Sequence, residues 1–404
     1  MTRRSGRLLP WLIALASTIA ALLVAEVLLR AWRPQAQRVF LLQSRSESER
    51  GKFCVYDPTL GWVGKPNVDD TFDAPDTHHQ VHQNRYGFRG PTIEFARTRA
   101  RRVVVLGDSF VWGLGVDDDE LFTTLLAHDS SPRLEVVNLG VSGYGTDQEL
   151  LLWQQLGQRF RPDLVLLVVT PWTDLYDNQF AERYDYPKPL FRWDEATANL
   201  VLTGVPVPQR TAAQVATASP DQTAPSAPGL RLIARSALVS NAVLALARVP
   251  SVRGALERSG IIFSRNPGQP WEDRFFEQPP NAQTANGWVL FGRLLSALAD
   301  SVQRTGAELV VVVVPSPMQV YPDLWADFER AHPRPPDHPL DPELPARLVT
   351  ELCNERHLRV IDLQPGLRDA AHDDPYLYYR WNMHWTTSGH RIVANILLRE
   401  LASR

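Results

Sequence analysis

Five short apolar runs, each continuous rather than alternating, constrain the fold of this 404-residue chain more than any other feature. They occupy residues 102–106, 134–139, 164–170, 309–314 and 358–363. Continuous apolar runs are typical of strands that are covered on both faces, as in parallel sheets. Helical patterns lie between the runs, for example at 148–160 and 288–304. The alternation predicts an α/β fold with a doubly wound parallel sheet, whose ligands bind beyond the carboxyl ends of the strands.

An insertion interrupts this alternation between about residues 180 and 286, because the interval is far too long for an ordinary connection. Its first part, 205–228, is rich in Pro, Ala, Thr and Gln, which predicts a mobile loop. Its second part, 230–249, has a helical pattern, interpreted as an amphipathic helix that packs on the core, with a lid or a membrane-surface helix as alternatives. The main domain is therefore expected to span 101–404 with this insertion.

Residues 34–100 contain several turn formers and few periodic apolar patterns, which predicts a connecting region lying against the main domain. His78, His79 and His82 fall within it. No helix fixes their geometry and no acidic residue stands at ligand spacing, so we expect solvated loop histidines rather than a metal site.

A run of apolar residues from 8 to 29 is long enough to cross a bilayer, and Glu26 alone interrupts it. Arg3, Arg4 and Arg7 precede the run and favour a cytoplasmic N-terminus. Residues 1–33 are thus interpreted as a cytoplasmic tail and a transmembrane anchor, with the rest of the chain outside the cytoplasm, in the periplasm. A cleaved signal peptide is the alternative.

Composition excludes two other classes of protein. The net charge of −3 offers no basic excess for binding nucleic acid. The chain has only two cysteines, Cys54 and Cys353, which excludes a disulfide-rich scaffold and a cysteine-based zinc site, although a single bridge between them stays open. No cofactor or metal is expected.

Ser109 is the candidate nucleophile. It follows the first buried run directly, within Gly107-Asp108-Ser109-Phe110, where a turn would lift its hydroxyl above the edge of the sheet. A serine hydroxyl needs a base to remove its proton and donors to stabilise the resulting oxyanion. His384 lies in a loop before the final helix and is the candidate base, whereas His390 is expected in the first turn of that helix in a structural role.

Four segments of the chain, taken in sequence order, resemble motifs of the SGNH/GDSL hydrolases. The resemblance is to membrane-anchored bacterial members in particular, which have a C-terminal Asp-x-His-Trp motif. The segments are 107–110, 138–148, 173–178 and His384-Trp385 with Gly389-His390, and the resemblance covers most of residues 54–402. The chain is also similar to alginate-type O-acetyltransferase hydrolase-like domains. The resemblance implies a flavodoxin-like sheet, a nucleophilic Ser109, and an oxyanion hole containing the N–H groups of Ser109 and Gly143.

Two positions depart from the pattern of the family. Thr173 stands where an asparagine side chain usually completes the oxyanion hole, and its hydroxyl has a shorter reach. Asn382 stands where a carboxylate would orient the imidazole, so its side-chain oxygen is expected to accept from the imidazole without supplying charge. Asp373 and Asp374 lie outside the motif spacing but are alternative sources of a carboxylate.

Three functions follow from these features. The first is an esterase that removes acyl groups, with acetyl expected, from an extracytoplasmic glycan or a small ester. The second is an O-acetyltransferase in exopolysaccharide modification, and the third is a catalytically weak binding protein. Four aromatic residues near the expected crevice are candidates either for stacking on sugars or for core packing: Tyr144, Trp172, Trp381 and Trp385.

Overall fold

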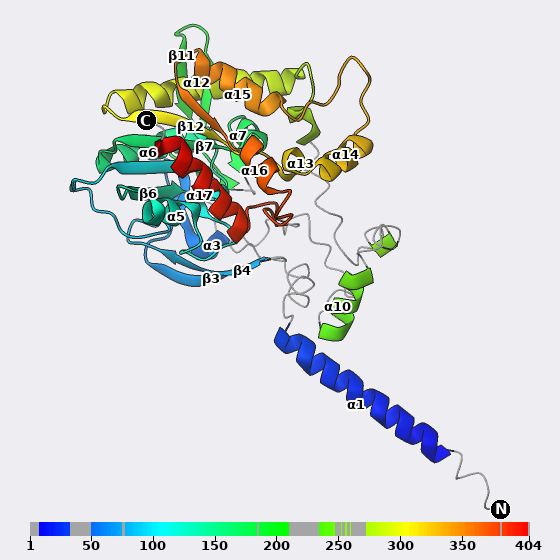
Figure 1. Ribbon diagram of the computed structural model, residues 1–404. Coiled ribbons are helices and arrows are strands. Elements are labelled where there is room, and N and C mark those ends of the chain that lie inside the picture. Colours follow the sequence, from blue (N-terminus) through cyan, green and yellow to red (C-terminus); the bar gives the residue numbers. More distant parts are fainter. Residues whose placement is uncertain are drawn as a thin grey trace, which may run out of the picture. The chain divides into compact units, whose positions relative to one another are not determined.

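The computed structural model describes residues 8–32, 50–74, 77–183, 186–209, 233, 235–246, 252, 255, 256, 259, 272–379 and 382–402. The chain divides into two compact units (Figure 1). The N-terminal unit comprises residues 1–48, 73–77 and 219–267. The α/β unit comprises residues 49–72, 78–218 and 268–404.

The α/β unit is built on a parallel sheet of five strands in the order β13-β12-β7-β5-β6. The strands are β5 (Arg102–Gly107), β6 (Glu135–Gly140), β7 (Leu164–Val169), β12 (Glu308–Val313) and β13 (Arg359–Asp362). Each coincides with one of the predicted runs, and the interior residues of β5 and β7 are almost fully buried. The doubly wound sheet is therefore confirmed. The strand order reverses between β5 and β7, and ligands of such sheets bind at this point.

Helices cover both faces of the sheet. One group packs together as α5 (Phe122–Asp129), α16 (Gln364–Ala370) and α17 (Thr387–Ala402). The other contains α6 (Thr146–Gln155), α7 (Pro171–Asp177), α12 (Ala282–Gln303) and α15 (Leu344–Asn354). In Figure 1, α12 and α15 lie above the sheet and α17 lies below it. Shorter elements complete the unit: α4 (Ser109–Trp112), η2 (Gly157–Phe160), η3 (Glu272–Phe275), α13 (Pro317–Val320) and α14 (Pro322–Ala331).

The region before the sheet is more regular than predicted. It forms α3 (Arg50–Phe53) and two antiparallel hairpins, β1 (Cys54–Asp57) with β2 (Gly61–Gly64), and β3 (Val68–Ala74) with β4 (Thr77–Gln83). Phe53 and Val81 pack with Trp112 of α4, so the region does lie against the main domain. The sequence missed β4 because its inward-facing positions include the polar residues Thr77, His79 and Gln83, so apolar and polar residues do not alternate there.

The prediction of solvated loop histidines was wrong for His79. All three histidines lie in β4, where His78 and His82 are exposed but His79 is only 2% exposed. The Nε2 atom of His79 accepts from the Gly115 N–H at 3.3 Å, and burial lowers the pKa of His79 to about 3. His79 therefore acts as a buried neutral acceptor. No cluster suited to a metal ion occurs among the described residues.

The described part of the insertion begins with two antiparallel hairpins, β8 (Glu182–Arg183) with β9 (Tyr186–Pro187), and β10 (Leu190–Asp194) with β11 (Asn199–Thr203). Of the predicted mobile loop at 205–228, the residues from 210 onward lie outside the described ones. In the structure, Cys54 and Cys353 do not form a disulfide bond with each other.

The N-terminal unit contains α1 (Leu8–Trp32) and α10 (Ala237–Leu246). The Glu26 carboxylate caps α10 by accepting from the N–H groups of Ala237 and Leu238, at 2.8 and 2.9 Å. This contact explains why an acidic residue interrupts the apolar run. It also corrects the prediction for 230–249, since α10 groups with α1 rather than with the core of the α/β unit. Within the described residues, no helix has the combination of length and apolar character needed to cross a membrane.

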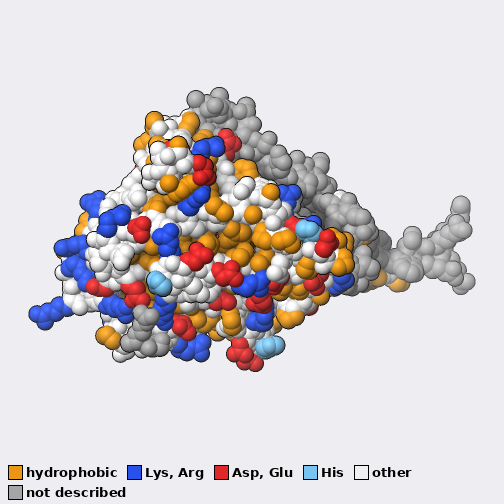
Figure 2. Space-filling view, turned by 90° about the horizontal axis from the view of Figure 1, so that it is seen from above, with side chains coloured by type: hydrophobic (Ala, Val, Ile, Leu, Met, Phe, Trp, Pro, Cys, Tyr) orange, Lys and Arg blue, Asp and Glu red, His pale blue; other side chains and the backbone are white. Residues whose placement is uncertain are grey.

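Charged side chains of both signs are mixed on the face that Figure 2 shows. In Figure 2, basic and acidic groups alternate around an apolar area on the face seen from above. This mixture agrees with the net charge of −3.

Candidate active site

Ser109 occupies a sharp turn between β5 and α4. The Asp108 side chain caps α4 by accepting from the Phe110 N–H at 2.8 Å. A Cβ atom at Gly107 would lie 2.3 Å from Cγ2 of Val111, and one at Gly140 would lie 2.3 Å from the backbone nitrogen of Trp112. Both positions therefore need glycine, which lets α4 sit directly on the ends of β5 and β6. Ser109 is consequently held at the carboxyl edge of the sheet, beside the reversal of strand order.

His384 reaches Ser109 from the loop that precedes α17. Its Nε2 atom lies 2.6 Å from the Ser109 Oγ, within hydrogen-bond distance. The imidazole stacks on Phe110, with ring centroids 4.7 Å apart and an angle of 28° between the planes. The structure thus brings together two residues that are 275 positions apart and that the sequence proposed as nucleophile and base.

Asn382 supports the imidazole in a different way from the one expected. The Nδ1 atom of His384 lies 2.7 Å from the backbone carbonyl oxygen of Asn382, while the side-chain oxygen of Asn382 accepts from the His384 N–H at 2.9 Å. Met383, between them, has a φ of 60°, a left-handed conformation that is uncommon for residues other than glycine and occurs often at functional sites. The expected acceptor, the side-chain oxygen, is therefore replaced by the main-chain oxygen.

No carboxylate contacts the His384 imidazole among the described residues. Asp374, one of the alternatives considered from the sequence, instead accepts from the Tyr376 N–H. Burial lowers the pKa of His384 to about 4, and the hydrogen bond to the Asn382 carbonyl opposes this shift only in part. The imidazole is consequently neutral at pH 7. Its Nδ1–H donates to Asn382, which leaves the Nε2 lone pair facing the Ser109 hydroxyl.

The N–H groups of Ser109 and Gly143 are the candidates for an oxyanion hole. Ser109 is the first residue of α4, so its N–H has no partner within the helix. Gly143 lies in the turn after β6 with a φ of 79°, which favours glycine. In the described part of the chain, neither N–H donates to a backbone carbonyl. The loop after β6 runs alongside Ser109, because the Val141 N–H donates to the carbonyl of Gly107 at 3.1 Å.

Thr173 is a weaker candidate for this hole than an asparagine would be. Its hydroxyl lies 3.1 Å from the Thr170 carbonyl oxygen and 3.5 Å from the Asp108 carboxylate. A hydroxyl has a single proton, and both of these neighbours are acceptors. Thr173 would have to give up such a contact in order to donate to an oxyanion.

His390 has the structural role that the sequence assigned to it. It lies in the first turn of α17, and its Nδ1 atom accepts from the Phe122 N–H of α5 at 3.2 Å. Burial lowers the pKa of His390 to about 3, so the neutral ring can act as this acceptor. The contact joins two helices that cover the same face of the sheet.

A group of buried acidic side chains beside the site was not found from the sequence. Asp108, Glu149 and Asp174 are each at most 3% exposed, and burial raises the pKa of all three, to about 6 for Asp108. Among the described residues, neither carboxyl oxygen of Glu149 has a hydrogen-bond partner. Acidic residues at the start of a helix are usually solvated, so only the fold shows that these are enclosed.

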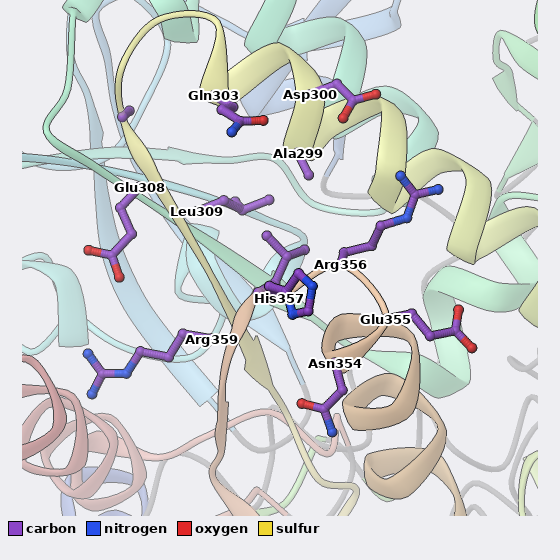
Figure 3. A pocket seen from close by; sticks show the side chains of 12 residues that line it. Ala299, Asp300, Gln303, Glu308, Leu309, Asn354, Glu355, Arg356, His357 and Arg359 are labelled. Carbon is purple, nitrogen blue, oxygen red and sulfur yellow. The ribbon is translucent and has the colours of Figure 1, made fainter.

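One pocket of the α/β unit lies away from this site. It measures about 810 Å³ and is formed at the amino ends of β12 and β13, with His357 and Arg356 near its centre (Figure 3). Ser109 and His384 lie beyond the opposite, carboxyl ends of the strands. The large pocket is therefore not the place where the Ser–His pair would act.

The parallel five-stranded sheet carries a Ser–His pair at its carboxyl edge. A family model described as "SGNH hydrolase-like domain, acetyltransferase AlgX" matches residues 274–404. This match covers less than half of the chain and includes Asn382 and His384. It confirms the resemblance seen in the sequence.

Several solved structures are similar to the chain at low identity. A lipase/acylhydrolase from Enterococcus faecalis is 12% identical, with a TM-score of 0.35 over 74% of this chain and 95% of that one. The acetylxylan esterase Axe2 from Geobacillus stearothermophilus is 11% identical, with a TM-score of 0.36 over 75% and 95%. These values are too low to support an argument about function. No curated protein matches the sequence.

Proposed function

We propose that this chain is a serine esterase of the SGNH/GDSL type that removes acyl groups, with acetyl expected, from an extracytoplasmic glycan or another ester. The observation that carries the proposal is the distance of 2.6 Å between the Ser109 Oγ and the Nε2 atom of His384. A neutral imidazole at this distance can take the hydroxyl proton as the oxygen attacks an ester carbonyl.

The reaction proceeds through an acyl-enzyme. The Ser109 Oγ bonds to the carbonyl carbon, its proton passes to Nε2 of His384, and the N–H groups of Ser109 and Gly143 stabilise the oxyanion. The C–O bond to the alcohol then breaks, and the imidazolium returns the proton to the departing oxygen. A water molecule, deprotonated by His384, attacks the acyl-enzyme, which releases the carboxylic acid and restores the serine hydroxyl.

Transfer of the acyl group to a glycan hydroxyl is the second candidate, favoured by the match to a family described as an acetyltransferase. The two reactions share the acyl-enzyme and differ only in the attacking hydroxyl group. In the described part of the chain no carboxylate contacts the imidazole, so in both reactions the imidazolium is less stabilised than in a complete triad.

The test uses the purified full-length chain with an acetylated oligosaccharide labelled in its acetyl groups. We expect released labelled acetate with the native chain and none with Ser109→Ala. Labelled acetyl groups on an added, unlabelled oligosaccharide would instead establish transfer. Equal acetate release by the native chain and Ser109→Ala would contradict both candidate reactions.

The location of the protein is a proposal that rests on the sequence alone. The apolar run at 8–29 and the preceding Arg3, Arg4 and Arg7 favour a membrane anchor with the α/β unit on the periplasmic side. A reporter fused to the C-terminus and active only outside the cytoplasm should be active. Activity only of a cytoplasmic reporter would contradict this orientation, and recovery of a shortened soluble form would indicate a cleaved signal peptide.

A further inference from the structure

A small pocket with aromatic walls lies between the β1–β2 hairpin and β9 of the α/β unit. Its volume is about 140 Å³. Tyr56 of β1 and Tyr186 of β9 line it, Trp62 of β2 contributes to its lining, and Pro208 and Gln209 come from the insertion. The pocket therefore combines a hairpin from the N-terminal side of the sheet with the described start of the insertion.

Tyr56 and Tyr186 are the aromatic residues of the lining that solvent can reach. Tyr56 is 39% exposed and Tyr186 is partly exposed, whereas Trp62 is only 2% exposed. The Tyr56 hydroxyl donates to the backbone carbonyl of Val207, which fixes its ring. Tyr186 meets Trp62 edge to face, with centroids 6.4 Å apart. The aromatic surface is thus held in place before any ligand binds, which reduces the entropic cost of binding.

Trp62 connects the pocket to the proposed oxyanion hole. Its indole Nε1–H donates to the carbonyl of Ser142 at 3.2 Å, and the Tyr144 hydroxyl donates to the carbonyl of Trp62. Gly143, whose N–H is proposed to stabilise the oxyanion, lies between Ser142 and Tyr144 in the chain. The wall of the pocket and the oxyanion turn therefore form one hydrogen-bonded assembly.

The size and chemistry of the pocket indicate the class of ligand. A cavity of about 150 Å³ is known to accept one benzene ring, so 140 Å³ suits one six-membered ring. None of the described residues that line it is charged. The described lining offers no charged partner for a carboxylate or an ammonium group, and aromatic faces suit the apolar C–H faces of a sugar ring.

We infer that this pocket is a subsite for one uncharged pyranose ring of the acylated glycan, adjoining the residue whose acyl group reacts at Ser109. The inference rests on the proposed function for its substrate. It also assigns different aromatic residues from those considered in the sequence, since Tyr144, Trp172 and Trp385 are at most 6% exposed and Trp381 lies outside the described residues.

The kinetic test compares Tyr186→Ala with Tyr186→Phe, which keeps the ring. The substrates are an acetylated neutral oligosaccharide, 4-nitrophenyl acetate and 4-nitrophenyl hexanoate. Tyr186→Ala should lower kcat/KM for the oligosaccharide at least tenfold, mainly through KM, and change that for 4-nitrophenyl acetate less than twofold. Tyr186→Phe should stay near the native values. An equal loss on all three substrates, or a loss confined to the hexanoate, would overturn the sugar subsite.

A binding measurement separates this inference from the proposed reaction. Saturation-transfer NMR would follow a deacetylated neutral oligosaccharide and a matched oligosaccharide of uronic acids, which need no catalysis. The native chain should bind the neutral compound, and Tyr186→Ala should lose the signal even if neither protein has esterase activity. Failure of the native chain to bind it, or preferred binding of the uronic compound, would contradict the subsite whatever the activity.

Discussion

The Nδ1 atom of His384 lies 2.7 Å from the main-chain carbonyl oxygen of Asn382. A carbonyl oxygen can orient the imidazole and select its tautomer, but it carries no full negative charge to stabilise an imidazolium. The acceptor belongs to the backbone, so it is retained whatever side chain stands at 382. Among the described residues, the Ser–His pair therefore lacks the negative charge that completes a triad.

Installing a carboxylate at this position should accelerate the reaction. In Asn382→Asp the side chain stays within hydrogen-bond distance of the His384 N–H, and its charge lies near the imidazole. We expect the pKa of His384 to rise from about 4 and kcat to increase severalfold. Initial rates with 4-nitrophenyl acetate measure this. A loss of tenfold or more would show that the Asn382 amide makes a contact that the reaction needs.

The pH profile of the native chain should have an acidic limb near pH 4. The active form is the neutral imidazole, and burial lowers its pKa to about 4. Protonation therefore removes the base only as the pH falls through this value, and kcat/KM should be constant from about pH 5 to 7. The profile is measured with an uncharged ester. A limb near pH 6.5 would show that the imidazole titrates as an exposed histidine does.

Restoring an amide at 173 should improve the oxyanion hole. Thr173→Asn has a longer side chain whose N–H groups are not held by the Thr170 carbonyl in the way the hydroxyl is. One such donor contributes about 2.7 to 4 kcal/mol of transition-state stabilisation, so kcat can rise by about 10²- to 10³-fold. Thr173→Val is the matched control and should cost less than tenfold. A large loss in the control would instead assign an essential hydroxyl to Thr173.

The buried Glu149 carboxyl should destabilise the protein at high pH. Its pKa is raised well above the usual value in the folded state, so its contribution to stability is present below the unfolded pKa and is lost as the pH rises. Glu149→Gln removes this dependence. Relative to the native chain, the variant should therefore be more stable at pH 8 than at pH 5, with a larger free energy of unfolding. Each unit of the raised pKa corresponds to about 1.4 kcal/mol.

Urea unfolding at the two pH values measures the difference. The exposed Glu351 provides the control Glu351→Gln, for which the difference should not depend on pH. A pH-independent effect of Glu149→Gln would mean that the Glu149 carboxyl titrates alike in the folded and unfolded states.

The sheet and the Ser–His pair were predictable for a physical reason. Strands buried on both faces must be apolar throughout, and the carboxyl ends of parallel strands meet at one edge, so the order of the motifs places Ser109 and His384 together. The role of the Asn382 carbonyl was not predictable, because it depends on the left-handed backbone at Met383. Likewise, β4 contains three histidines, and only the folded chain shows that His79 faces inward.

The most direct test of the account is covalent labelling with a fluorophosphonate, which reacts with serine hydroxyls activated by a base. Mass spectrometry of peptides from the native full-length chain should show one adduct, on Ser109. His384→Ala should react at least 10²-fold more slowly, since the base that activates the hydroxyl is gone. Absence of an adduct on Ser109, or equal labelling rates in the native chain and His384→Ala, would contradict the catalytic pair and favour a binding protein on the same fold.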